Sequence, residues 1–92
     1  MPVSYPPIGN RVVAKVIDKP ASCTIGMEVG DEYELSTHKC GDFCGLFYHH
    51  IAGWVKTLQF GGTVPFFPDP DVQIWECPNA NNKVKIELRR TK

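Results

Sequence analysis

The sequence predicts an α+β fold, in which one amphipathic helix packs on one face of a small antiparallel sheet of about four strands. Three observations indicate this fold. Residues 11–18 are rich in β-branched side chains, residues 32–36 and 83–90 alternate between apolar and polar side chains, and apolar side chains recur at helical spacing within residues 45–60. The chain has 92 residues, which provide one hydrophobic core. We therefore expect a proline-rich extended arm at residues 1–9 and a single α+β domain at residues 10–92.

The first half of the domain contains two expected strands. Residues 11–18 include Val12, Val13 and Val16, and Pro20 ends this strand because it has no amide to donate to a ladder. In residues 32–36, Tyr33 and Leu35 point to one side and the polar residues to the other, which is typical of a half-buried strand.

The expected helix covers residues 45–60. Its apolar stripe comprises Phe47, Ile51, Trp54, Val55 and Leu58. Asp42 or Cys44 is expected near the N-cap, with capping as the default role of Asp42. Gly61 and Gly62 are expected to form the C-cap, since glycine tolerates the left-handed conformation.

The second half begins with a proline-rich stretch, residues 63–70, in which Phe66 and Phe67 are expected to pack as a lid over the core. Residues 72–76 and 83–90 are the expected third and fourth strands. Residues 77–82 contain asparagines that tolerate positive φ, so they are expected to connect these strands as a hairpin.

Charge and hydropathy exclude some classes of function. The chain carries ten basic and ten acidic residues, so no overall positive field attracts phosphates, and nucleic-acid binding is not expected. No apolar run is long enough for a membrane span, and residues 1–7 do not have the pattern of a signal peptide. These observations favour a cytoplasmic protein without membrane contact.

All four cysteines fall in expected connections between elements, where ligands often converge: Cys23, Cys40, Cys44 and Cys77. Four thiolates suit a tetrahedral Zn²⁺ site or an iron–sulfur cluster. However, Cys40 and Cys44 are separated by three residues, whereas zinc knuckles usually have two between their cysteines. Buried core thiols, or a redox pair or disulfide, therefore remain open alternatives.

Two of the histidines are additional candidate ligands. His38 precedes Cys40 by two residues and could replace a cysteine. On the helical wheel, His50 is expected at the edge of the apolar stripe and His49 on the solvent side, so His50 is the better candidate of these two.

A combination of segments along the chain resembles a family of short uncharacterised prokaryotic proteins. It consists of Cys23, Val29-Gly30-Asp31-Glu32-Tyr33-Glu34, Phe43-Cys44 opening a helix, Gly61-Gly62 after it, and Cys77-Pro78 before Val84-Lys85-Ile86-Glu87-Leu88-Arg89. The resemblance implies a domain of about ninety residues, single or repeated, with three matching cysteine positions. These positions fall on Cys23, Cys44 and Cys77, and Cys40 lies outside the pattern. The family implies no particular activity.

Three functional hypotheses follow. The first is a small accessory protein that binds zinc or an iron–sulfur cluster through Cys23, Cys44 and Cys77, with Cys40, His38 or His50 completing the site. The second is an interaction module, a small subunit of a larger enzyme or a homo-oligomer, that uses the proline-rich arm and Phe66-Phe67 as its contact surface. The third is a thiol enzyme, in which the helix dipole favours a thiolate at Cys44.

Overall fold

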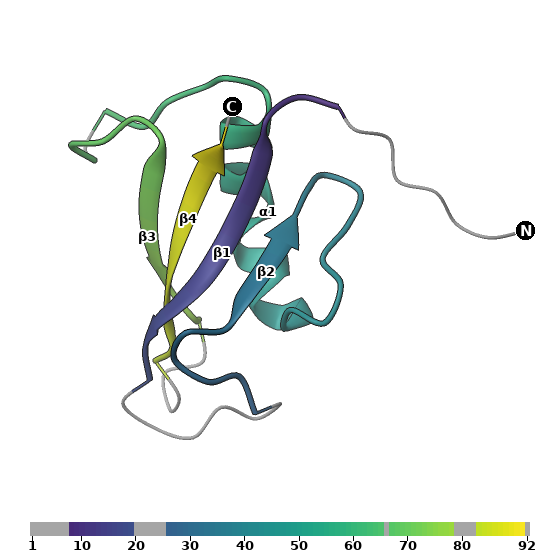
Figure 1. The fold of residues 1–92 in the computed structure, drawn as a ribbon, viewed down its shortest axis with the longest axis vertical. Helices are drawn as coiled ribbons and strands as arrows, with labels where there is room; N and C mark the ends of the chain where they lie inside the picture. The colour runs from purple at the N-terminus through teal and green to yellow at the C-terminus, as the bar shows by residue number, and fades with distance from the viewer. Residues whose placement is uncertain (1–7, 20–25, 66, 79–82, 92) are drawn as a thin grey trace, which may run out of the picture.

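The structure is a computed structural model that describes residues 8–19, 26–65, 67–78 and 83–91. Within these residues, one helix packs against a four-stranded antiparallel sheet of order β2-β1-β4-β3 (Figure 1). The elements are β1 (Arg11–Asp18), β2 (Glu32–Leu35), α1 (Gly45–Gln59), β3 (Val72–Glu76) and β4 (Lys85–Thr91). The α+β prediction is therefore confirmed, with element boundaries within two residues of those expected.

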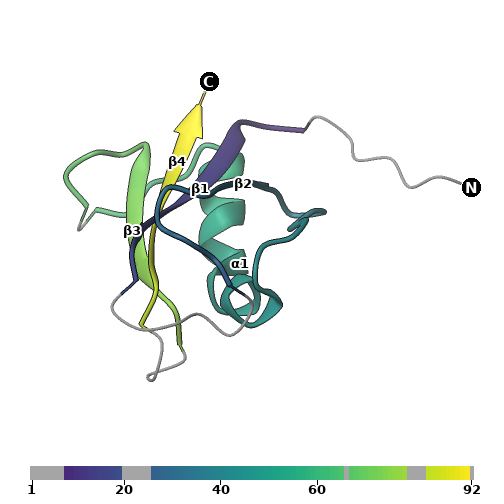
Figure 2. The same ribbon diagram turned by 60° about the horizontal axis from the view of Figure 1, so that its bottom comes forward.

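The helix lies on one face of the sheet, and the two views in Figures 1 and 2 agree on this placement. The core forms between them because alternate residues of the central strands point toward α1. On the sheet side it contains Val12, Ala14, Val16, Ile86 and Leu88, and on the helix side Phe47, Ile51, Val55 and Leu58, each at most 1% exposed. The opposite face of the sheet carries mostly polar and charged side chains, together with Val13 and Ile74.

The strand boundaries differ slightly from the predicted ones for local reasons. β2 ends at Leu35 because Ser36 pairs with Lys39 across a tight turn. β4 begins at Lys85 and extends to Thr91, which pairs with Arg11 at the start of β1. The third strand was predicted with its observed bounds.

The predicted C-cap of the helix is confirmed. The C-cap residue is Phe60, and Gly61, which follows it, has a left-handed φ of +88°. Its N–H donates to the Leu58 carbonyl at 3.3 Å, and the Gly62 N–H donates to the Thr57 carbonyl at 2.8 Å. These are the two bonds of a Schellman motif, which satisfies carbonyls that the helix leaves unpaired.

At the other end of the helix, Cys44 is the N-cap, and it forms no side-chain capping hydrogen bond. The default role of Asp42 as a capping residue is therefore wrong, because the N-cap lies two residues later at Cys44 and Asp42 is exposed.

Two buried polar side chains hold the end of the domain where α1 terminates. Gln59, at 1% exposure, accepts hydrogen bonds from the Thr37 N–H at 2.7 Å and the Thr37 hydroxyl at 2.9 Å, and donates to the Ile8 carbonyl at 2.9 Å. The Asn10 N–H donates to the Gln59 carbonyl at 2.7 Å. The last described residues of the arm are thus fixed to the helix end, and residues 1–7 lie outside the described part.

Arg90 is the second of these side chains. Its guanidinium donates to carbonyls of Leu58, Gly62 and Pro70 at 3.3, 2.8 and 3.0 Å. It also pairs with the Asp71 carboxylate at 2.9 Å. Arg90 therefore joins the end of α1 to the turn that precedes β3, and its positive charge lies where the helix dipole favours a cation.

The proline-rich stretch is partly described. The Phe67 ring meets the edge of Trp75 with a centroid distance of 5.6 Å, and Trp75 stacks on Trp54 of α1 at 4.8 Å. Phe67 is half-buried by this packing, in line with the predicted lid, whereas Phe66 lies outside the described residues. No helix in the described part of the chain is both long and apolar enough to cross a membrane.

Candidate functional site

One end of the sheet, the lower end in Figure 1, brings together the start of α1 and the end of β3, which adjoin two of the cysteines. β1 and β3 end there, and β2, α1 and β4 begin there. Cys44 immediately precedes α1, and Cys77 immediately follows β3. Because antiparallel connections alternate between the two ends of a sheet, residues far apart in sequence meet at this end.

Cys44 is held by the start of the helix. Its carbonyl accepts the helical hydrogen bond from the Tyr48 N–H at 2.9 Å. Its side chain precedes Phe47 by three positions, so it continues the apolar stripe of α1. The side chain is half-buried and packs against the core.

Cys77 is held by the β3–β4 pairing, which continues one step past β3. Its N–H donates to the Val84 carbonyl at 2.7 Å. Val84 is 1% exposed, and Cys77 shares the helix side of the sheet with Trp75 because residues two apart in a strand point the same way. Cys44 and Cys77 therefore border the same core at the same end of the sheet.

Cys40 lies in the loop before α1 and also packs against the core. Its carbonyl accepts a hydrogen bond from the Phe43 N–H at 3.0 Å, in a turn that directs the Phe43 ring inward. Burial raises the pKa of the nearby Tyr48 phenol, with a smaller electrostatic contribution from Cys40. The Tyr48 hydroxyl donates to the Ser36 carbonyl, so the loop is fastened to the helix at this point.

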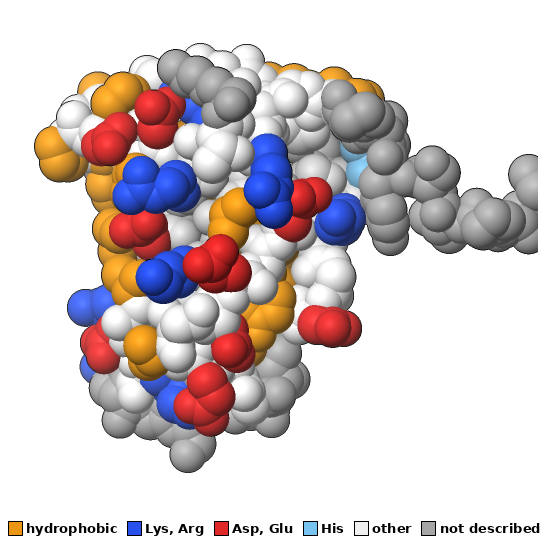
Figure 3. Space-filling model, in the orientation of Figure 1, with side chains coloured by type: hydrophobic (Ala, Val, Ile, Leu, Met, Phe, Trp, Pro, Cys, Tyr) orange, Lys and Arg blue, Asp and Glu red, His pale blue; other side chains and the backbone are white. Residues whose placement is uncertain are grey.

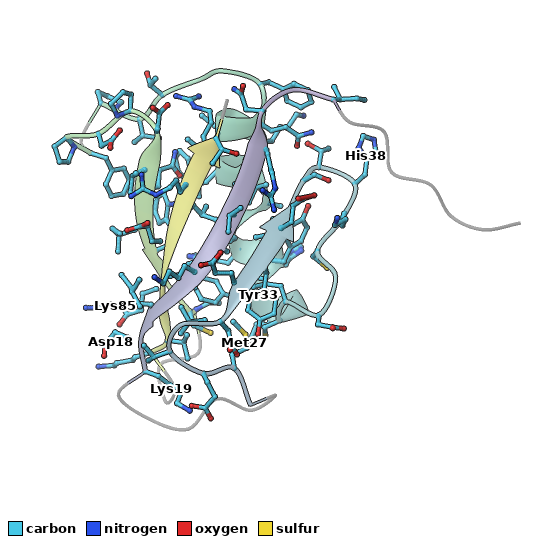
Figure 4. The ribbon with its side chains drawn as sticks, viewed as in Figure 1. Asp18, Lys19, Met27, Tyr33, His38 and Lys85 are labelled. Atoms are coloured by element: carbon cyan, nitrogen blue, oxygen red, sulfur yellow. The ribbon has the colours of Figure 1, made fainter. Side chains whose placement is uncertain are left out.

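The histidines do not join this group. His38 is exposed in the turn after β2, at the far end of that strand from Tyr33 and Met27 (Figure 4). His50 is exposed like His49, so the expected position of His50 at the edge of the apolar stripe is wrong.

The remaining predicted ligand, Cys23, lies outside the described residues. The described residues that flank it are joined by an ion pair between Lys19 and Glu28 at 2.6 Å. Figure 4 shows Lys19 and Met27 at the same end of the sheet as the start of α1. In the described ranges, no three His, Cys, Asp or Glu side chains form a group that could hold a metal ion.

A second feature is a groove on the uncovered face of the sheet, with a volume of about 420 Å³. It is lined by Arg11, Val13, Lys15, Glu32, Glu87, Arg89 and Thr91. The sequence alone gave no reason to group these residues, because their proximity depends on the pairing of β2, β1 and β4. Figure 3 shows basic and acidic side chains interspersed over this face.

Ion pairs largely neutralise the groove. Arg11 pairs with Glu34 at 2.6 Å, and Arg89 pairs with Glu87 at 3.1 Å. The hydrogen bond from Arg11, together with one from Lys39, lowers the pKa of Glu34. Cations and carboxylates alternate along the groove, whose lining has three basic side chains (Arg11, Lys15 and Arg89) against two acidic ones (Glu32 and Glu87). One excess positive charge attracts a phosphate only weakly, and we assign the groove no ligand.

No family model matches the sequence, and comparisons with curated proteins and with solved structures find no match either.

Proposed function

We propose that this protein is a small accessory protein that binds zinc or an iron–sulfur cluster through cysteine thiolates at the lower end of the sheet. The observation that supports this proposal best is the position of Cys44 and Cys77. They come from segments more than thirty residues apart in the sequence, yet both border the core at the end where α1 begins.

The proposed ligands are Cys23, Cys44 and Cys77, the three positions that the family resemblance implies. Lys19 and Met27, which flank Cys23 in the sequence, lie at this end of the sheet, and Lys19 forms an ion pair with Glu28. Cys40 is the first candidate for a fourth ligand, because it is half-buried against the same core. His38 and His50 become weaker candidates, since both are exposed and His38 lies at the other end of β2.

Metal analysis of anaerobically purified protein tests the proposal. We expect about one zinc ion or one cluster per chain, because thiolate sites of this kind are stoichiometric. An iron–sulfur cluster would also give visible absorption. We further expect a chelator to lower the denaturation midpoint of the loaded protein, since metal binding adds to the folding free energy.

Serine variants identify the ligands. Cys23→Ser, Cys44→Ser and Cys77→Ser should each lose most of the metal, and Cys40→Ser is the matched control if three cysteines suffice. Loss of metal in all four variants would indicate a four-cysteine site. A colourless, metal-free protein that unfolds cooperatively would overturn the proposal.

A second candidate function is supported by the surface near the root of the arm. The side chains of Ile8 and Phe60 are 46% and 51% exposed. The two residues lie close together, because Gln59, which directly precedes Phe60, donates a hydrogen bond to the Ile8 carbonyl. Exposed apolar side chains beside a proline-rich arm suit a contact with a larger enzyme, in which this protein would be a small subunit.

Co-purification of the tagged protein from its source tests this second function. Phe60→Ser should reduce recovery of a stoichiometric partner, while Leu46→Ser, at a position that is 56% exposed, should not. A protein that purifies alone, and whose Phe60→Ser variant changes only in stability, would exclude this function.

A further inference from the structure

β3 is an edge strand whose backbone is open on one side. Two hydrogen bonds fix which residues face β4: the Cys77 N–H donates to the Val84 carbonyl at 2.7 Å, and the Arg90 N–H donates to the Asp71 carbonyl at 2.8 Å. In an antiparallel ladder the residues that face a given neighbour alternate along the strand. Odd-numbered residues of β3 therefore bond to β4, and the backbone groups of Val72, Ile74 and Glu76 point away from it.

These outward groups are largely unused. The Val72 N–H donates to the Asp69 carbonyl at 3.2 Å, in the turn that begins the strand. The amide and carbonyl of Ile74 and of Glu76 have no protein partner among the described residues. They form a short row of donors and acceptors at the edge of the sheet, which is a template for another strand.

The opposite edge of the sheet is protected, which makes the β3 edge distinctive. β2 has four residues, and its outer face carries Glu32 and Glu34. Glu34 is paired with Arg11 and Lys39. Short length and charged side chains are devices by which proteins prevent edge pairing. At the β3 edge the corresponding central residue is Ile74, 38% exposed, and Figure 3 shows hydrophobic side chains along this side of the molecule.

We propose that β3 pairs with β3 of a second copy of this chain, antiparallel and across a two-fold axis at Ile74. A symmetric contact requires a self-complementary surface. The outward backbone groups meet this requirement, because Val72 and Glu76 flank Ile74 at equal distances along the strand. In this register Ile74 exchanges two hydrogen bonds with the second copy's Ile74, and Glu76 N–H groups donate to Val72 carbonyls of the opposite strand.

The side chains fit the same register. On the outer face the two Ile74 side chains meet each other, which is a favourable cross-strand pair. On the helix side Gln73 lies opposite the second copy's Trp75. Gln73 is 1% exposed, and its buried Nε2 has no hydrogen-bond partner within the described part of the single chain, so this donor is available for a contact with the second copy. The contact joins two four-stranded sheets into one.

Ile74→Pro is the sharpest test. Proline removes the Ile74 N–H, which the proposed dimer uses and the β3–β4 ladder does not, and proline is tolerated on an edge strand in this orientation. Ile74→Lys is the second variant, because it keeps the backbone donor and introduces like charges at the two-fold axis. Leu46→Lys is the control for removal of an exposed apolar side chain elsewhere, at 56% exposure.

The measurement is molar mass by light scattering and sedimentation equilibrium over a range of protein concentrations. We expect a dimer for wild type and Leu46→Lys. Ile74→Pro should raise the dimer dissociation constant at least about tenfold, since losing a pair of hydrogen bonds has an effect of that order. Ile74→Lys should also raise it, because like charges directly opposite each other are destabilising. Circular dichroism checks that the variants are folded, and if Ile74→Pro unfolds, Ile74→Lys decides. A monomeric wild type, or a dimer unaffected by Ile74→Lys, would overturn the proposal.

Discussion

Replacement of Arg90 by methionine tests the account of how the domain is held together at the end of α1. Methionine keeps much of the apolar stem and removes the guanidinium. The variant removes one hydrogen-bond donor from each of the carbonyls of Leu58, Gly62 and Pro70 and from the carboxylate of Asp71. The Arg90 side chain is 4% exposed, so water replaces these bonds poorly.

The magnitude follows from the burial of the two partners. Breaking a buried ion pair by removing one member costs about 3–5 kcal/mol. Asp71 is 34% exposed and can be partly rehydrated, so the lower end of that range applies, about 3 kcal/mol. A loss of this size lowers the melting temperature of a domain of this length by roughly 12–24 °C.

The assay is equilibrium unfolding in urea, followed by the fluorescence of Trp54 and Trp75, which stack on each other in the folded state. Arg89→Met is the matched control. The Arg89 side chain is 51% exposed, and its pair with Glu87 on the open face should contribute less than about 1 kcal/mol. Equal destabilisation by the two substitutions would refute the role given to Arg90.

Further predictions concern a close contact and two titrating groups. Gly9→Ala places a Cβ 2.3 Å from the Gln59 carbonyl oxygen, whereas a Cβ at Gly30, which also has a positive φ, meets no atom within 4 Å. Gly9→Ala should therefore destabilise the domain more than Gly30→Ala, and similar urea unfolding midpoints for the two variants would contradict this. The hydrogen-bonded ion pairs with Arg11 and Lys39 lower the pKa of Glu34 below 4.5. The contribution of Glu34 to the free energy of unfolding is therefore present at neutral pH and is lost as the pH falls through the folded-state pKa. Glu34→Gln should therefore be less stable by up to about 1 kcal/mol at neutral pH and equal to wild type in strong acid, which unfolding curves at both pH values would check. Burial raises the pKa of Tyr48 above 10.0, so the folded state retains its proton and loses stability as the unfolded chain ionises at higher pH. Tyr48→Phe should weaken this loss of stability at alkaline pH. An unchanged slope of the unfolding free energy against pH in the variant would contradict the role given to Tyr48.

Much of the fold could be predicted because it depends on local periodicity. The alternation in residues 83–90 and the helical stripe from Phe47 to Leu58 each identify an element and its buried face. Even Arg90 carried a signal, since it lies two residues after Leu88 and so points toward the core. It was missed because arginine is rarely buried without a partner, and its partners come from distant segments.

The candidate site was less predictable. The helical wheel placed His50 at the edge of the stripe, whereas in the structure its side chain is exposed. Asp42 was expected to cap the helix because its residue type favours that role, yet the chain enters the helix at Cys44. Both errors arise where packing, rather than residue type, sets the outcome.

The sequence by itself determined the kind and order of the elements and the placement of the cysteines in connections. Those properties follow from side-chain spacing and from where glycine and proline interrupt regular structure. Only the tertiary structure decided that Cys44 and Cys77 border one core at one end of the sheet, and that, among the described residues, β3 is left as an open edge opposite the protected edge formed by β2. The physical reason is that strand order and pairing register are set by the burial of a shared core, and nothing in a single segment specifies its neighbours.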